Sequence, residues 1–239
     1  MSGHSKWSQI KHKKALTDQK RGKLFSKLSR LITVAAKQKG GNPQTNPGLS
    51  LAIDRAKSFN MPVDNIERAI KKGTGELEGV NFEDLLIEAY GPGGVALLIE
   101  GTTDSRNRTV AEIKHLLSLH EGKLANPGSV AWLFERRGIV VAAKKTDKES
   151  LELEAIESGA EDLNWIDEES LEICTKPEEL EKVKKALTEK EVAINDASLA
   201  WVAKNEVAIS DPKEKERLEK LLEALDENDD VSEVYANTK

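Results

Sequence analysis

The chain has 239 residues, of which 33% are charged and 38% hydrophobic, and this length allows two or three small domains. Its one cysteine, Cys174, excludes an intramolecular disulfide and favours a reducing compartment. No apolar run approaches the ~20 residues that span a bilayer, and the start lacks the apolar core of a secretory signal. We therefore expect a cytoplasmic protein without membrane contact.

Charge is distributed unevenly along the chain. Residues 1–72 hold 16 Lys and Arg against 4 Asp and Glu, a net charge of +12, whereas the remainder carries −18. A basic segment of this density is typical of a polyanion-binding surface, and nucleic acid is the polyanion that we expect. The alternative is a solvated lysine-rich face, which is what a lone run of charges usually is.

Residues 1–20 contain few apolar side chains and no sustained period, so we expect a flexible basic arm that becomes ordered on binding. Apolar side chains at helical spacing then predict three short helices, at 21–39, at about 48–59 and in a segment that stops at Gly73. Together they form a predicted bundle over residues 21–78. In the first helix a second stripe, beside the apolar one, is basic and consists of Lys23, Lys27, Arg30 and Lys37.

An α+β pattern begins after residue 79. The expected elements are strands at 85–90, 95–100 and about 130–135 and a helix at 105–119. Pro92 and Gly93 suit the two central positions of a turn between the first two strands. Asp104 can cap the helix that follows the second strand.

Residues 136–205 have the order βαββαβ of a ferredoxin-like unit. Its expected strands are 138–143, 162–166, 170–175 and 198–204, and its expected helices are 148–158 and 177–188. The elements left after it are a strand near 206–209, a helix at 212–225 and a strand at 231–235. We therefore predict an α+β fold, in which an N-terminal three-helix bundle is followed by two ferredoxin-like α+β domains, one inserted in the other. The discontinuous domain is 79–135 plus 206–239, and the inserted domain is 136–205.

Candidate nucleic-acid contacts gather in the arm and the first helix. They are Lys6, Trp7, Lys11, His12, Lys13, Lys14, Lys20, Arg21, Lys23, Lys27 and Arg30. Cationic side chains of this kind bind phosphates and release counterions, which gives a steep salt dependence. Trp7 has two open roles, stacking on a base or docking on the protein's own helices. More cations continue through the bundle, namely Arg55, Lys57, Arg68, Lys71 and Lys72.

Arg106, Asn107 and Arg108 form a candidate secondary anion site, because they open a predicted helix where backbone N–H groups favour an anion. The alternative is that these arginines pair with nearby carboxylates. The acidic stretches lack a calcium-loop pattern, and the histidines lack Cys or carboxylate neighbours at ligand spacing. We therefore expect no metal site, no cofactor and no catalytic centre. The 136–205 unit also lacks the stacking aromatics of RNA-recognition strands.

Four blocks of the sequence resemble the YebC/PmpR family: MSGHSKWSQIKHKKALTDQKRGKLFSKL, NMPVDNIERAIKKGTGE, YGPGGVALLIEGTTDSRNRT and GSVAWLFERRG. They span the chain from residue 1 to about 138, and the turn at 122–127 (GKLANP) departs from the family's usual pattern. The resemblance implies a helical bundle with two α+β domains. It also implies nucleic-acid contacts at the matching basic residues, which are Lys6, Lys11, Lys13, Lys14, Lys20, Arg21, Lys23 and Lys27. Members of the family are described as DNA-binding transcriptional regulators, and a second branch acts in translation on ribosomes stalled at proline-rich stretches.

We therefore expect a non-enzymatic nucleic-acid-binding regulator of gene expression, with DNA as the target. The alternative is a ribosome-associated translation factor that binds ribosomal RNA. Two other classes stay open, a metal-dependent nuclease that uses the acidic clusters and a protein-only adaptor. The residues themselves do not decide between DNA and ribosomal RNA, and they fix neither the sequence specificity nor the oligomeric state.

Overall fold

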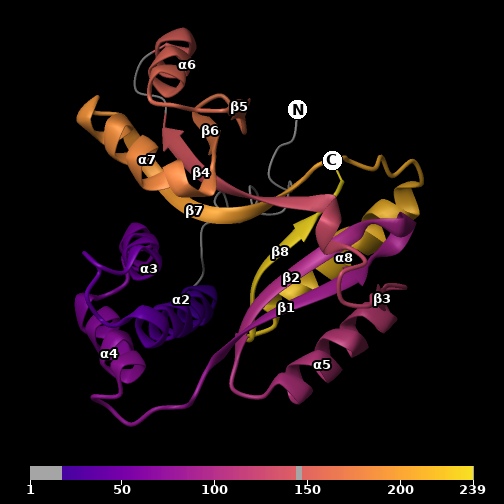
Figure 1. The fold of residues 1–239 in the computed structure, drawn as a ribbon. Coiled ribbons are helices and arrows are strands. Elements are labelled where there is room, and N and C mark those ends of the chain that lie inside the picture. The colour runs from indigo at the N-terminus through magenta and orange to yellow at the C-terminus, as the bar shows by residue number, and fades with distance from the viewer. Residues whose placement is uncertain (1–17, 144–146, 239) are drawn as a thin grey trace. The chain divides into compact units, whose positions relative to one another are not determined.

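The structure is a computed structural model that describes residues 18–143 and 147–238 (Figure 1). Most of the predicted arm therefore lies outside the described residues. The chain forms two compact units, one of residues Glu135–Val202 and the other of residues 18–134 with 203–238. As predicted, the fold is α+β, with three N-terminal helices followed by two four-stranded antiparallel sheets.

Three helices form the bundle: α2 (Asp18–Lys39), α3 (Pro47–Ser58) and α4 (Val63–Thr74). Their apolar faces meet in one core, which includes Leu28, Ile32, Leu49, Ile53, Ile66 and Ala69. The Asn46 side chain caps α3 by accepting a 3.1 Å hydrogen bond from the backbone N–H of Leu49. Helices α2 and α4 approach closely at Gly73, where an added Cβ would lie 2.3 Å from the carbonyl oxygen of Thr33.

The first sheet has the strand order β3-β1-β2-β8, and its neighbouring strands are antiparallel. Its strands are β1 (Glu83–Tyr90), β2 (Ala96–Thr103), β3 (Lys123–Leu124) and β8 (Val231–Ala236). Helices α5 (Arg106–Leu119) and α8 (Pro212–Glu227) pack on one face of this sheet (Figure 1). The shared core includes Leu85, Ile87, Leu97, Ile99, Ile113, Leu117, Leu221 and Leu225. In the turn between β1 and β2, Gly93 has the expected positive φ, 67°.

Residues 134–203 form the second sheet and two helices in the predicted order βαββαβ. The elements are β4 (Phe134–Ala143), α6 (Lys148–Glu157), β5 (Asp162–Trp165), β6 (Ser170–Thr175), α7 (Leu180–Glu189) and β7 (Ala193–Ala203). The strand order β5-β6-β4-β7 places the first and third strands of the unit in its centre. Asp147 caps α6 by accepting a 2.9 Å hydrogen bond from the backbone N–H of Ser150.

The strand predicted near 130–135 is wrong in its first half. The backbone N–H groups of Val130 and Ala131 donate to the Glu88 carboxylate, at 2.5 and 2.9 Å, instead of to a neighbouring strand. These bonds hold the segment in a short 3-10 helix, η2 (Ala131–Leu133), and β4 begins after it.

The strand predicted near 206–209 is also wrong. In its place the structure has one isolated bridge between Val207 and Thr238. The N–H of Val207 donates to the carbonyl of Asn237 at 2.7 Å, but the pairing does not extend into a ladder.

The predicted cap of α5 is a third error. Ser105, not Asp104, is the residue that precedes the first helical position. The Asp104 carboxylate accepts a 2.7 Å hydrogen bond from Arg108 one turn later. An ion pair between residues i and i+4 has therefore taken the place of the cap.

Candidate nucleic-acid interface

The basic stripe of α2 packs against the rest of its own unit. Lys23, Lys27 and Arg30 follow the spacing i, i+4, i+7, and Val34 continues the stripe at i+11. Val34 is buried although it is not part of the bundle core, and α2 lies in contact with β2. Helix α2 therefore has two packed faces, one in the bundle and one against the first sheet.

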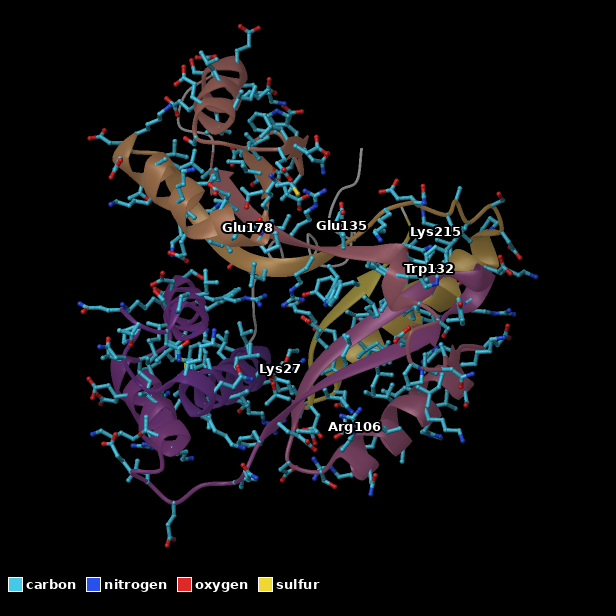
Figure 2. The ribbon with its side chains drawn as sticks, viewed as in Figure 1. Lys27, Arg106, Trp132, Glu135, Glu178 and Lys215 are labelled. Carbon is cyan, nitrogen blue, oxygen red and sulfur yellow. The ribbon has the colours of Figure 1, made fainter. Side chains whose placement is uncertain are left out.

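The C-terminal end of α8 receives two of the stripe's cations. The Lys27 ammonium donates to the backbone carbonyl of Asp226 and lies 3.8 Å from the carboxylate of the same residue. Lys23 donates to the carbonyl of Glu227 at 3.3 Å. Carbonyl groups at a helix C-terminus carry partial negative charge, so they attract cations. Lys27, marked in Figure 2, is only 7% exposed, which withdraws it from solvent.

Arg30 joins α2 to the segment that enters β8. Its guanidinium donates to the carbonyl of Asp229 at 2.8 Å and to the carboxylate of Asp230 at 2.5 Å. It also lies over the ring of Phe82, 5.4 Å from the ring centroid. The prediction of Arg30 as a nucleic-acid contact therefore did not include these contacts within the protein.

Further polar contacts hold the bundle to the first sheet. Arg55 of α3 forms an ion pair with Glu233 of β8, and Lys37 donates to the Asn81 side chain at 2.5 Å. The predicted basic stripe thus bonds to the rest of its own unit, although only Lys27 in it is buried. Spacing alone could not show this role, because several of its partners lie about 200 residues further along the chain.

Asp230 is an acceptor shared by α2, α5 and the first sheet. Besides the bond from Arg30, its carboxylate accepts from the Thr109 hydroxyl at 2.6 Å, from Arg108 at 2.7 Å and from Thr103 at 3.2 Å. Burial alone would raise the pKa of Asp230, but Thr109, Arg108 and Arg30 outweigh burial and hold the pKa below its ordinary value. The side chain is 6% exposed, so these partners replace nearly all of its hydration.

Many of the predicted nucleic-acid contacts fall outside the residues that the structure describes. Lys6, Trp7, Lys11, His12, Lys13 and Lys14 lie outside the described residues, as does the side chain of Lys20. Arg21 is exposed near the start of α2. Nucleic-acid binding by these residues stays a prediction.

A second group of cations on the bundle is exposed. It consists of Lys39 on α2, Lys57 on α3 and Arg68, Lys71 and Lys72 on α4. Within the part of the chain that the structure describes, their side chains take part in no hydrogen bond or ion pair. The three cations of α4 are spaced i, i+3, i+4, so they share one face, and the buried Ile66 and Ala69 lie on another. This group is the surface best suited to bind phosphates.

The candidate secondary anion site is only partly open. Arg106, which is labelled in Figure 2, and Asn107 are exposed in the first turn of α5. Arg108 instead pairs with Asp104 and Asp230, both at 2.7 Å, and the bond to Asp230 is the main reason why the pKa of Arg108 is raised. The alternative of arginine–carboxylate pairing is therefore right for Arg108. An anion site at the other two residues stays a prediction.

The described residues also bear on the requirements of a metal site, a reactive thiol and a membrane-spanning helix. In that part of the chain no three His, Cys, Asp or Glu side chains gather as a metal-binding group. Burial raises the pKa of the Cys174 thiol to about 11, so the thiol is protonated at neutral pH. No helix among these residues has the length and apolar character needed to cross a membrane.

Known proteins resemble this chain over nearly its whole length. A model of the TACO1/YebC protein N-terminal domain matches residues 5–76, and a model of the TACO1/YebC second and third domain matches residues 82–238. Proteins named "probable transcriptional regulatory protein" from Halothermothrix orenii and Persephonella marina are 52% and 51% identical; the matches cover 99% of this chain and 94% and 95% of theirs. The crystal structure of a conserved hypothetical protein from Aquifex aeolicus matches with a TM-score of 0.91 at 50% identity, over 98% of this chain and 97% of that one. The chain therefore belongs to the TACO1/YebC family.

Proposed function

We propose that this protein is a non-enzymatic regulator of transcription that binds DNA through its N-terminal bundle and the basic segment before it. One observation carries the proposal, the group of exposed bundle cations whose side chains have no partner within the described residues: Lys39, Lys57, Arg68, Lys71 and Lys72. Cationic side chains without an internal carboxylate are available to phosphates. The names of the relatives support a role in the regulation of transcription.

The division of charge supports one orientation on DNA. Residues 1–72 carry a net charge of +12 and the remainder carries −18. A polyanion is therefore attracted to the bundle and repelled by the two sheets with their helices. The net negative charge of the remainder thereby disfavours non-specific binding of nucleic acid outside the bundle. We expect the cytoplasm as the compartment of this function.

The cations of α4 suit backbone binding better than base reading. Arg68, Lys71 and Lys72 share one helix face without an Asn or Gln among them. Lysine and arginine contacts to phosphates fix the position of a protein on the duplex, but they carry no sequence information. We therefore expect binding that depends steeply on salt.

The salt dependence of DNA affinity tests this function. The test variant is Arg68→Gln/Lys71→Gln/Lys72→Gln. If all three cations contact phosphates, the slope of log K against log salt concentration falls in magnitude by about 3, since each contact contributes about 0.9.

A matched variant removes the same charge elsewhere. Lys213, Lys215 and Lys220 are exposed on α8, and their joint change to Gln is expected to alter the slope by less than about 1. Equal slopes for the two triple variants would overturn the assignment of the interface to α4. Thermal unfolding of both variants checks that the fold is retained.

The α4 variant also separates DNA from ribosomal RNA. A DNA regulator binds its sites more than ~10³-fold more tightly than random DNA. Co-sedimentation with ribosomes that is lost in the α4 variant, without such a preference for any DNA, would favour the translation factor instead.

A further inference from the structure

Trp132 is an exposed aromatic residue that the proposed function does not use. The residue, which is labelled in Figure 2, belongs to η2, ahead of β4. Its side chain is 63% exposed. Burial of apolar surface contributes roughly 25 cal/mol per Å². The exposed part of the indole ring does not gain this stabilisation. The residue belongs to GSVAWLFERRG, one of the blocks on which the family resemblance rests.

The loop under this ring is fixed by Glu88 of β1. The Glu88 carboxylate accepts hydrogen bonds from the backbone N–H groups of Gly128 and Val130, both at 2.5 Å, and of Ala131 at 2.9 Å. Its backbone carbonyl accepts a further bond from Ala125 at 2.9 Å. Hydrogen bonds to an ionised acceptor are strong, so they hold the loop in one conformation.

The indole ring is tied to the same loop. Its Nε1–H donates to the carbonyl of Ser129 at 3.0 Å, and the ammonium of Lys204 donates to the carbonyl of Trp132 at 2.8 Å. Because the only polar atom of the indole is already bonded, the ring offers a partner its flat apolar surface. Because this hydrogen bond already fixes the orientation of the ring, the side chain loses little conformational entropy when it binds a partner.

The surroundings of the ring favour a nucleobase over a protein. The other exposed residues of the loop at 125–133 are Asn126, Pro127 and Gly128, and Lys204 adds a cation. A protein-binding hot spot normally lies in a fully desolvated apolar centre. Sites that bind single-stranded nucleic acid instead combine exposed aromatic rings, on which any base can stack, with cationic side chains, and here Lys204 lies at the backbone carbonyl of Trp132.

We propose that Trp132 is a stacking platform for an unpaired base of the bound nucleic acid, with Lys204 beside it for the adjoining phosphate. The proposal rests on the proposed nucleic-acid-binding function and adds that the bound strand is locally unpaired. The bundle cations bind the backbone of paired and unpaired strands alike, so duplex affinity does not depend on Trp132.

The test uses two probes, a single-stranded oligothymidylate and a DNA duplex of equal length. Trp132→Ala is expected to weaken binding of the single strand by about five- to a hundredfold, the range of one lost base–aromatic stack. Trp132→Phe keeps a ring that can stack, so it is expected to retain most of the affinity. Both variants are expected to bind the duplex within about twofold of wild type.

The outcomes separate this proposal from the function on which it rests. Equal single-strand affinity of Trp132→Ala and wild type would overturn the platform and leave DNA binding intact. If wild type binds neither probe, the proposed function fails and the platform fails with it. Capture of a protein by wild type but not by Trp132→Ala, with unchanged binding of both probes, would overturn the platform in favour of protein docking.

Discussion

Arg30 of α2 donates a 2.5 Å hydrogen bond to Asp230, which lies 200 positions further along the chain. The same carboxylate accepts from Arg108 of α5, so one acid joins the bundle, α5 and the first sheet. Carbonyl groups at the end of α8 accept from Lys23 and Lys27 nearby. The cations of the bundle are thus of two kinds, those that bond to the rest of the unit and those whose side chains have no partner among the described residues.

Asp230→Asn is expected to lower the free energy of unfolding by about 2 kcal/mol. Hydrogen bonds to charged groups contribute about 1.5–3 kcal/mol each, and solvent reduces the contribution of the half-exposed Arg108. Urea denaturation measures the change. Asp229→Asn is the matched control, since Asp229 uses its backbone carbonyl and its side chain is exposed; we expect a loss within about 0.5 kcal/mol. Equal losses in the two variants would contradict a central role for the Asp230 carboxylate.

Asp230 also gives stability a pH dependence of definite sign. Its pKa is lower in the folded protein than in the unfolded chain, where the pKa of aspartate is about 3.9. Its contribution is therefore complete above about pH 5 and is lost as the pH falls through the folded pKa. Between about pH 6 and 3, wild type is expected to lose more stability than Asp230→Asn, which cannot be protonated. Parallel curves of unfolding free energy against pH would contradict the depressed pKa.

Lys27 and Lys39 lie on the same helix but are expected to respond differently to replacement by Met. Lys27→Met removes a buried hydrogen bond to the end of α8 and lowers stability by about 1–2 kcal/mol, with little change in DNA affinity. Lys39→Met leaves stability within about 0.5 kcal/mol but reduces the magnitude of the salt slope of DNA binding by about 1. Urea denaturation and fluorescence anisotropy with a labelled duplex measure the two effects. The reverse pattern would place the phosphate contact at Lys27.

Two helical glycines of the bundle are expected to respond with opposite signs to replacement by Ala. Gly73→Ala places a Cβ 2.3 Å from the Thr33 carbonyl oxygen, so α2 and α4 must separate and stability falls by about 1–3 kcal/mol. Around Gly22 an added Cβ has no atom of the described residues within 4 Å, so Gly22→Ala is expected to raise stability by about 0.5–1 kcal/mol. Thermal unfolding of both variants checks the signs. A stabilising Gly73→Ala would show that α2 and α4 are not in backbone contact there.

Local patterns were enough to predict most helices and strands. Leu28 and Ile32 repeat at helical spacing and are buried in the bundle core, because an amphipathic helix must cover its apolar face. The unit from β4 to β7 was also predictable, since its strands and helices alternate along a continuous segment.

Roles that depend on distant partners were not predictable from spacing. Lys27 looks like a phosphate-binding residue until folding brings Asp226 to it. Trp132 stands in the apolar run VAWLF, which is typical of a buried strand. Glu88, about 40 residues earlier, binds the N–H groups of this segment and leaves the ring exposed.

Ultraviolet crosslinking in growing cells, followed by sequencing of the attached nucleic acid, tests the central claim most directly. The claim is that exposed cations on the bundle bind DNA, so the control is the variant Arg68→Gln/Lys71→Gln/Lys72→Gln. We predict DNA fragments attached to the wild-type protein and their loss in the variant. Ribosomal RNA clustered at one site, or DNA crosslinks that are equal in the two proteins, would contradict the account.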